Sequence, residues 1–287
     1  MIPPSEVPAG AVPARERVAI VVPCRNEATR ITLLLDGVRA QEVSVDDIVV
    51  VDTGSTDATR DIVAQYQRSH QDLPLTCLLR SGISVAAALN VAIEVAQGEI
   101  IMRLDGHCRP RPDYVRGTLA VLRATGAGVV GGAWEIVPGA PTRCAEAIAH
   151  AVSHPLGAGD AAYRTARVSD GRMAVDTVPF GSFRKTTWQA LGGFDEALLT
   201  NEDYEFNYRA RSMGLRVVLD PDLRCTYFAR GTLSKLARQY FRYGWWKARM
   251  LRRHPSSLRW RQLLPATLVP LLGGVLVAVL AWPVWWV

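Results

Sequence analysis

The chain lacks the cysteine and glycine motifs that define several large protein classes. Its five cysteines are odd in number, scattered and never spaced as C-x-x-C, which argues against a disulfide framework and indicates reduced thiols in the cytosol. The motif G-x-G-x-x-G is absent, which weakens a dinucleotide-dehydrogenase interpretation. The motif G-x-x-x-x-G-K-S/T is also absent, which excludes a P-loop NTPase.

Three segments differ from the rest of the chain because they lack an apolar core, acidic residues or all charged residues. Residues 1–16 have no apolar core and no cleavage pattern, so we predict a flexible leader and not a signal peptide. Residues 230–261 contain no acid but many Lys and Arg side chains interleaved with aromatic residues, in a chain of net charge +6. Residues 263–287 contain no charged side chain and are long enough to cross a bilayer as a helix, although their prolines would kink it.

The last two segments favour association with a membrane. We expect residues 231–262 to form a basic-aromatic amphipathic segment at the lipid interface and residues 263–287 to form a hydrophobic membrane segment. The arginines just before the apolar run would place its N-terminal side at the cytoplasmic face of the cell membrane. A buried core helix beside an amphipathic neighbour is the alternative. A nucleic-acid partner is not expected, because the apolar run explains the basic charges better.

Residues 17–104 alternate between short β-branched apolar runs and longer stretches with helical periodicity. Each run is too short for a helix and fits a strand that is buried on both faces. We expect strands at 17–23, 47–52, 75–79 and 99–105, and helices at 27–41, 55–69 and 84–98. Ser55 and Asp57 are candidates to cap the second helix, and Gly98 is a candidate to end the third. This repetition predicts a parallel sheet with right-handed crossovers.

The patterns are weaker after residue 104. We expect strands within 126–137, 180–185, 215–220 and 223–228, and a helix within 200–214. Residues 155–175 are rich in Gly, Ala and Arg without periodicity, which predicts a mobile loop over the site.

Polar residues follow each of the first four predicted strands, and the carboxyl ends of parallel strands meet at one edge of a sheet. A pocket there that holds Asp52, Arg80 and Asp105 would suit a nucleotide. A carboxylate can accept from a base N–H or a ribose hydroxyl, and Arg can pair with a base edge or a phosphate.

Asp105 and His107 are two residues apart at the end of the fourth predicted strand, within RLDGHC (103–108). Mg²⁺ and Mn²⁺ prefer carboxylate, water and phosphate oxygens, and Mn²⁺ also accepts imidazole. The pair therefore fits an incomplete metal site whose other ligands come from a substrate diphosphate. In the alternative interpretation, Asp105 caps a turn and His107 is a surface residue.

Glu202 and Asp203 stand at the start of a predicted helix. Adjacent carboxylates at such a position usually cap the helix or stabilise its dipole. One of them could instead accept a proton from an attacking hydroxyl.

Taken in order, these segments resemble family 2 glycosyltransferases of the GT-A fold over roughly residues 17–250. The matching segments are VVPCRNE (21–27), VVVDTGSTDAT (49–59), RLDGHC (103–108), FGSFRK to LGGFDE (180–196), NEDYEF (201–206) and RQYFRYGWWK (238–247). The chain looks most like the bacterial succinoglycan-type exopolysaccharide enzymes, which also carry a C-terminal membrane segment.

The resemblance implies an α/β fold with a GT-A (Rossmann-like), mostly parallel sheet flanked by helices. Residues 17–230 would form the catalytic domain, followed by an interfacial and a membrane helix. The implied nucleotide contacts are Pro23, Asn26, Glu27, Asp52, Ser55, Asp57, Arg80 and Asp105. Asp105 and His107 would hold Mn²⁺ or Mg²⁺, with His107 in place of the usual second acid. Asp203 would be the catalytic base with Glu202 beside it, and Arg242, Trp245 and Trp246 would lie near the diphosphate, the acceptor or the lipid interface.

The implied reaction is an inverting transfer of a sugar from a nucleotide donor, expected to be a UDP-sugar, to a hydroxyl of a lipid-linked or polysaccharide acceptor. Two alternatives stay open. A metal-dependent nucleotidyltransferase would want a Gly-rich, Arg- or Lys-bearing loop after the first strand, where this chain has PCRNEA. A catalytically inactive, membrane-tethered nucleotide-sugar-binding module is kept open by His107.

Overall fold

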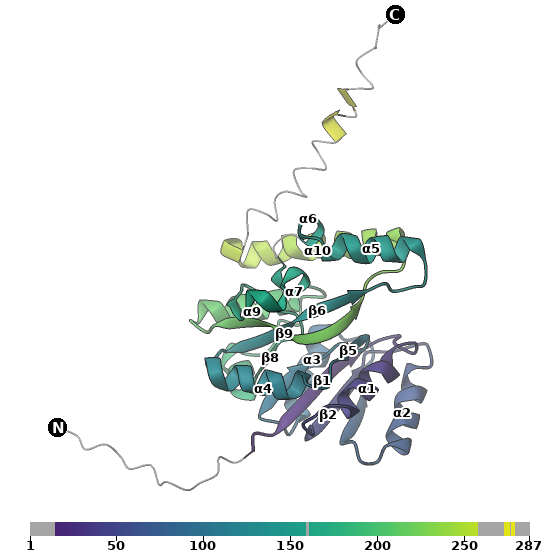
Figure 1. Cartoon of the computed structure of the whole chain (residues 1–287), viewed down its shortest axis with the longest axis vertical. Helices are drawn as coiled ribbons and strands as arrows, with labels where there is room; N and C mark the ends of the chain where they lie inside the picture. Colours follow the sequence, from purple (N-terminus) through teal and green to yellow (C-terminus); the bar gives the residue numbers. More distant parts are fainter. Residues whose placement is uncertain (1–14, 159–160, 258–272, 276, 279–287) are drawn as a thin grey trace, which may run out of the picture.

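The polar residues that follow the strands are positioned by one nine-stranded sheet with helices on both faces (Figure 1). The computed structural model describes residues 15–158, 161–257, 273–275 and 277–278. The strands are β1 (Val18–Cys24), β2 (Asp47–Asp52), β3 (Leu75–Leu79), β4 (Ile100–Arg103), β5 (Cys108–Pro110), β6 (Val129–Val137), β7 (Met173–Ala174), β8 (Ser182–Arg184) and β9 (Val217–Phe228). The α-helices are α1 (Ile31–Arg39), α2 (Thr59–Ser69), α3 (Val85–Val95), α4 (Tyr114–Thr125), α5 (Arg143–Ser153), α6 (Pro155–Ala158), α7 (Ala162–Thr165), α8 (Lys185–Leu191), α9 (Glu202–Ser212) and α10 (Leu233–Arg253), with short 3₁₀ turns at Val168–Asp170 and Pro255–Ser257.

The first four strands form the predicted parallel half of the sheet, in the order β3-β2-β1-β4. Alternate residues of β1 face opposite cores, so that Ile20 packs toward α1, α2 and α4 while Val21 packs toward α3, α8 and α9. Burial on both faces explains why β1, β2 and β4 are continuous apolar runs and not alternating ones, whereas β3, at the edge of the sheet, is partly exposed.

The other half of the sheet is mixed, which corrects the expectation of a mostly parallel sheet. The order continues β8-β6-β9-β5, and the pairs β4–β8, β6–β8, β5–β9 and β7–β9 are antiparallel, whereas β6–β9 is parallel. Strand β8 causes the change of direction because it enters between β4 and β6 against both. The short runs in this half carry no sequence signal for strand direction.

The two strands predicted at 215–220 and 223–228 are one bent strand, β9. Its register with β6 shifts between Gly132 and Ala133. A side chain at Gly132 would place its Cβ 2.0 Å from the Leu223 carbonyl oxygen, so this close crossing requires glycine.

Two predicted helix boundaries are also corrected. Helix α2 begins at Thr59 after Ala58, and Ser55 bonds to the Asn26 amide instead of capping the helix. Helix α3 ends before Gly98, which lies against β1, where a Cβ would approach the Ala19 nitrogen to 2.4 Å.

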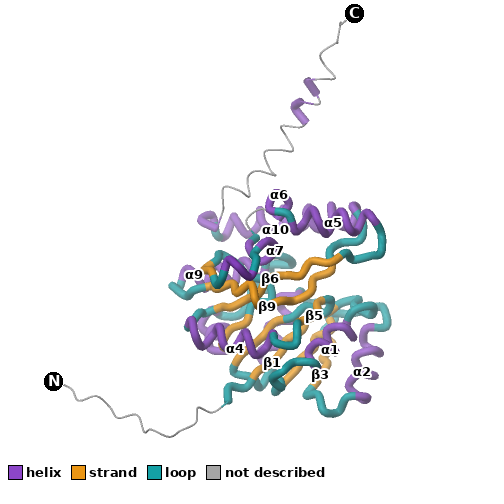
Figure 2. Tube along the Cα trace, in the orientation of Figure 1, coloured by secondary structure: helices purple, strands orange, loops and turns teal. Residues whose placement is uncertain are grey.

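Helices α5, α6 and α10 form a further layer beyond β6 and β9, as Figures 1 and 2 show. The segment predicted as a loop at 155–175 contains α6, α7, a 3₁₀ turn and β7. In the described part of the chain, no helix combines the length and hydropathy needed to span a membrane. Most of the predicted membrane segment 263–287 and of the leader 1–16 lies outside the described residues.

Candidate active site

The loops that follow β1 and β2 are held together by side-chain to backbone hydrogen bonds. The Asn26 amide donates to Ser55 Oγ at 2.9 Å, and Asn26 Oδ1 accepts from the Thr56 amide at 2.8 Å. Asp57 Oδ2 accepts from the Ala28 amide at 3.2 Å. Asn26 has a φ of 57°, a left-handed conformation that Asn tolerates better than most residues. Asn26, Ser55 and Asp57 therefore build the platform at this sheet edge and do not line the cavities described below.

Asp52 ends β2 on the same platform and is 1% exposed. Its Oδ1 accepts from the amides of Gly54 and Ser55 at 2.8 and 2.7 Å, which holds the carboxylate in a tight turn. Its Oδ2 is buried and has no hydrogen-bond donor among the described residues. Arg80 is exposed beside it, with its amide bonded to the Asp52 carbonyl. Asp52 thus keeps one buried carboxylate oxygen without a donor among the described residues, and it lines neither of the cavities described below.

Two cavities meet beyond the carboxyl end of β4. The first, about 450 Å³, is basic, and its lining includes Arg25, Arg230, Lys235, Arg238 and Arg242. The second, about 660 Å³, is aromatic, and its lining includes Trp134, Tyr163, Phe180, Tyr204, Tyr227, Tyr240 and Tyr243. Residues that line both cavities include Arg103, Asp105, His107, Thr200, Glu202, Arg230, Gln239 and Tyr243. Both volumes fall within the range of small-molecule sites.

Arg103 occupies the junction of the cavities, and it is not among the residues predicted from the sequence. Its side chain is 4% exposed and donates to three carboxylates. It reaches Asp105 at 3.1 Å and Glu202 at 2.9 Å, and it also contacts Asp203. A signal was available, because RLDGHC opens with an Arg at the end of an apolar strand, where a buried guanidinium needs acids.

Asp203 lines the aromatic cavity and is absent from the lining of the basic one. Burial raises the pKa of its carboxyl to about 7; Arg103 opposes this rise, and the charges of Glu202 and Asp105 add to it. A carboxyl group with this pKa exchanges a proton near neutral pH, as a general base requires.

His107 and Glu27 form a hydrogen-bonded pair at the same junction. His107 Nδ1 lies 2.9 Å from Glu27 Oε1, and both side chains are 19% exposed. Burial would lower the pKa of His107, but the bond to Glu27 and the charge of Asp105 raise it above its usual value. When Nδ1 donates to Glu27, the neutral ring presents Nε2 as an acceptor.

The residues at the junction fit a divalent cation as a partial ligand set. No group of three or more His, Cys, Asp and Glu side chains arranged for a metal occurs within the described residues. Asp105 engages Arg103 through Oδ1, and His107 engages Glu27 through Nδ1, which leaves one carboxylate oxygen and one imidazole nitrogen. Oxygen and nitrogen donors of this kind suit Mn²⁺ better than Mg²⁺, with the other ligands supplied by a diphosphate and water.

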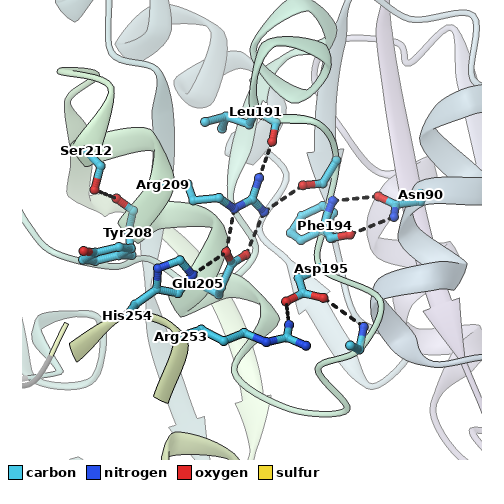
Figure 3. A network of polar contacts seen from close by, with 12 residues as sticks. Asn90, Leu191, Phe194, Asp195, Glu205, Tyr208, Arg209, Ser212, Arg253 and His254 are labelled. Atoms are coloured by element: carbon cyan, nitrogen blue, oxygen red, sulfur yellow. Dashed lines mark hydrogen bonds and ion pairs between the residues drawn. The ribbon is translucent and has the colours of Figure 1, made fainter. Parts of the chain in front are cut away.

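Helix α9, which carries Glu202 and Asp203, is fixed from its other side by a polar network (Figure 3). Glu205 is 2% exposed and accepts from Arg209 at 2.6 and 2.7 Å. Arg209 also donates to the Leu191 carbonyl and, at 2.8 Å, to the Gly193 carbonyl, both at the end of α8. His254 lies 3.4 Å from Glu205 and ties the network to the end of α10. The helix is thereby held in one position against α8 and α10.

The remaining predicted residues lie either in the basic cavity or outside both cavities, next to Arg249. Pro23 and Arg242 line the basic cavity, and Arg242 Nη2 donates to Thr200 Oγ1 at 3.3 Å. Trp245 and Trp246 line neither cavity and lie under the Arg249 guanidinium instead. The aromatic residues of the second cavity were missed, because the sequence holds Trp134, Tyr163 and Tyr227 far apart and without a pattern.

The structure is thus a mixed α/β sheet with acids gathered beyond its parallel strands, where α/β proteins bind their ligands. The family model "Glycosyl transferase family 2" matches residues 19–219. The succinoglycan biosynthesis protein ExoA of Rhizobium meliloti (strain 1021) is 32% identical over 267 residues, which is 92% of this chain and 78% of that protein. The chain therefore belongs to glycosyl transferase family 2 and is a glycosyltransferase.

Other similar proteins support the fold. A Methanococcus voltae glucuronosyltransferase, whose name gives dolichyl N-acetylglucosaminyl phosphate as its acceptor, is 24% identical over 85% of this chain and 76% of that protein. The mannosyltransferase PcManGT from Pyrobaculum calidifontis, solved with GDP-Man and Mn²⁺, aligns with a TM-score of 0.63 at 25% identity over 84% of this chain. S. aureus TarS 1-349, solved with UDP-GlcNAc, gives 0.58 at 19% identity over 75%. The chain covers 65% and 59% of those two solved chains.

Proposed function

We propose that this chain is an inverting glycosyltransferase that moves a sugar from a nucleoside diphosphate donor, in particular a UDP-sugar, to a hydroxyl of a lipid-linked or polysaccharide acceptor. Residues 17–230 are proposed as the catalytic domain. The observation that carries the proposal is the position of Asp203, a carboxylate with a pKa of about 7 that faces the aromatic cavity at its junction with the basic one.

The two cavities suit two different substrates. A nucleoside diphosphate carries negative charge, and the cations of the basic cavity would neutralise it. The nucleoside would lie at the platform, where Asp52 and Arg80 would contact the base or ribose and where Asn26, Ser55 and Asp57 hold the two loops together. A sugar acceptor presents apolar C–H faces and hydroxyls, which aromatic walls accommodate.

A divalent cation is part of the proposal. Asp105 and His107 would hold it, and Glu27 would orient the His107 ring, as carboxylates commonly do for metal-binding histidines. When bound, the ion would neutralise charge that develops on the departing diphosphate.

In the proposed reaction, Asp203 accepts the proton of the acceptor hydroxyl while the oxygen of that hydroxyl forms a bond to C1 of the donor sugar. The bond from C1 to the diphosphate oxygen breaks with its electron pair on the diphosphate, and the anomeric configuration inverts. Arg103 holds Asp203 and Asp105 in fixed positions on either side of the reacting centre. Arg242 would help to retain the leaving diphosphate in the basic cavity.

We also propose that the enzyme works at the cytoplasmic face of a bacterial membrane. On α10, Phe241 and Trp245 are four residues apart and 72% and 56% exposed, whereas Tyr243 and Lys247 line the aromatic cavity. One helix thus offers an apolar, basic face to lipid and another face to the acceptor. The dolichyl-linked acceptor in the name of the Methanococcus voltae relative supports a lipid-linked acceptor here.

Binding of the whole protein to vesicles that contain anionic lipid tests this location. The double variant Phe241→Ser/Trp245→Ser is expected to weaken binding about tenfold or more, because two partly inserted aromatic side chains are lost. The control is Met213→Ser, which removes a side chain of similar exposure at the end of α9. Equal binding of both variants and wild type would refute the lipid-facing role of α10.

The reaction is tested by nucleotide release from a panel of nucleotide sugars with Mn²⁺, with and without a lipid-linked acceptor. Asp203→Asn is expected to lower turnover by about 10²–10⁴-fold while donor binding is nearly unchanged. Asp72→Asn, in an exposed ion pair with Arg39, is the control and should retain activity. Normal turnover by Asp203→Asn would remove the proposed base. Release of pyrophosphate would indicate a nucleotidyltransferase, and no release from any donor would indicate an inactive binding module.

A further inference from the structure

The aromatic cavity holds a guanidinium that has no carboxylate partner within the described residues. Arg164, on α7, lines this cavity and is absent from the lining of the basic one. Its guanidinium carbon lies 5.5 Å from the Trp134 ring centroid and 5.6 Å from that of Tyr163. Its Nη1 donates to the Tyr240 hydroxyl at the long distance of 3.4 Å. Among the described residues, the five N–H donors of Arg164 therefore meet tyrosine hydroxyls and no carboxylate.

This arrangement differs from that of two arginines in the fold whose partners include buried carboxylates. Arg103 contacts three carboxylates, and Arg209 pairs with Glu205. A buried charge is costly unless an opposite charge accompanies it. Among the described residues, Arg164 contacts aromatic rings and tyrosine hydroxyls, which bring no opposite charge to the cation.

A second donor in the same lining also lacks an acceptor. Trp134 Nε1 and Arg164 Nε are both buried and unbonded among the described residues. The Trp134 ring is fixed, because it stacks on Tyr227 at 4.0 Å and meets Tyr163 edge-on at 4.8 Å. Two positioned N–H donors beside one cavity indicate that an acceptor group arrives with the ligand.

The donor diphosphate does not account for this group. The basic cavity contains its own cations, including Lys235, Arg238 and Arg242, on the opposite side of the junction. Arg164 instead shares its cavity with Asp203, where the attacking hydroxyl is proposed to lie.

We propose that the aromatic cavity binds a sugar acceptor that carries an anionic substituent, and that Arg164 recognises this anion. The inference rests on the proposed function of the cavity as the acceptor site and names the class of acceptor. The anion is either the phosphate that joins the sugar to a lipid or the carboxylate of an acidic sugar. Both accept bidentate hydrogen bonds from a guanidinium.

Isothermal titration of the whole protein with three probes tests the proposal without any need for turnover. The probes are octyl glucoside, octyl glucosyl phosphate and octyl glucuronide, which share one sugar ring and one chain and differ in charge. Wild type is expected to bind at least one anionic probe about 10- to 100-fold more tightly than octyl glucoside, the range of one charge-assisted hydrogen-bonded pair. Preference for the phosphate indicates a lipid-linked acceptor, and preference for the glucuronide indicates an acidic sugar.

Variants assign the preference to Arg164. Arg164→Gln should lose the preference and leave octyl glucoside binding unchanged, and Arg164→Lys should restore part of it. Arg167→Gln, which removes an exposed arginine of the same segment, is the control and should behave as wild type. Thermal unfolding of each variant shows whether the fold is intact.

Equal binding of all three probes by wild type would overturn the proposal, as would absence of binding by both anionic probes at millimolar concentration. A preference that survives in Arg164→Gln would also overturn it. These outcomes are independent of sugar transfer, so failure of the proposed reaction and failure of this inference are distinguishable.

Discussion

Two arginine–carboxylate networks lie on opposite sides of helix α9, and they differ in their balance of charge. On one side Arg209 faces a single buried carboxylate, Glu205, and its remaining donors reach backbone carbonyls (Figure 3). On the other side Arg103 faces Asp105, Glu202 and Asp203. The first network is balanced, whereas the second has one cation for three acids.

The imbalance separates a structural network from a functional one. A balanced buried pair with satisfied hydrogen bonds fixes the position of a helix and needs nothing more. Excess carboxylate charge in a buried site is relieved by a proton or by a bound cation. The raised pKa of Asp203 shows that this carboxyl takes up a proton more readily than an ordinary one. The metal proposed at Asp105 and His107 would be the bound cation.

The largest expected effect on stability comes from the balanced network. Arg209→Met leaves the Glu205 carboxylate buried without its partner and is expected to lower the free energy of unfolding by about 3–5 kcal/mol. Urea denaturation measures the change. In contrast, Asp203→Asn removes a carboxylate whose pKa is raised on folding, so at neutral pH it should raise the free energy of unfolding and not lower it. A larger loss in Asp203→Asn than in Arg209→Met would break the distinction.

A smaller effect is expected from Glu27, which acts on the unbalanced network through His107. Glu27→Gln weakens the orientation of the imidazole and should lower Mn²⁺ affinity about 10- to 100-fold. The signal of free Mn²⁺ in electron paramagnetic resonance reports this affinity without turnover. Glu42→Gln, in an exposed pair with Arg116, should bind Mn²⁺ as wild type does. Unchanged affinity in Glu27→Gln would show that the pair is only structural.

The sequence predicted the parallel half of the molecule well and the mixed half poorly. Strands β1 to β4 are continuous apolar runs with polar residues at their ends, so both the sheet and its functional edge could be derived locally. The direction of β8 and the bend of β9 depend on contacts such as that of Gly132 with the Leu223 carbonyl, which no local pattern encodes.

The candidate site also contains residues that the sequence predicted and residues that only the structure shows. Asp105, His107 and Asp203 were derived from short motifs, and the structure brings them to the lining of one cavity. Arg103 carries a local signal in its position at the end of an apolar strand, but its full role depends on Glu202 and Asp203, which lie 99 and 100 residues away in the sequence. Asn26 and Ser55 are engaged in joining two loops, which spacing alone does not distinguish from ligand binding.

The most direct test of the account is the pH dependence of kcat/KM for the acceptor. Asp203 must be ionised to accept a proton, so activity should fall as pH decreases through about 7, to roughly one tenth at pH 6. The account predicts a rising limb with an apparent pKa near 7 in wild type and no such limb in the residual activity of Asp203→Asn. A profile that is flat between about pH 5.5 and 8, or a limb that persists in the variant, would contradict it.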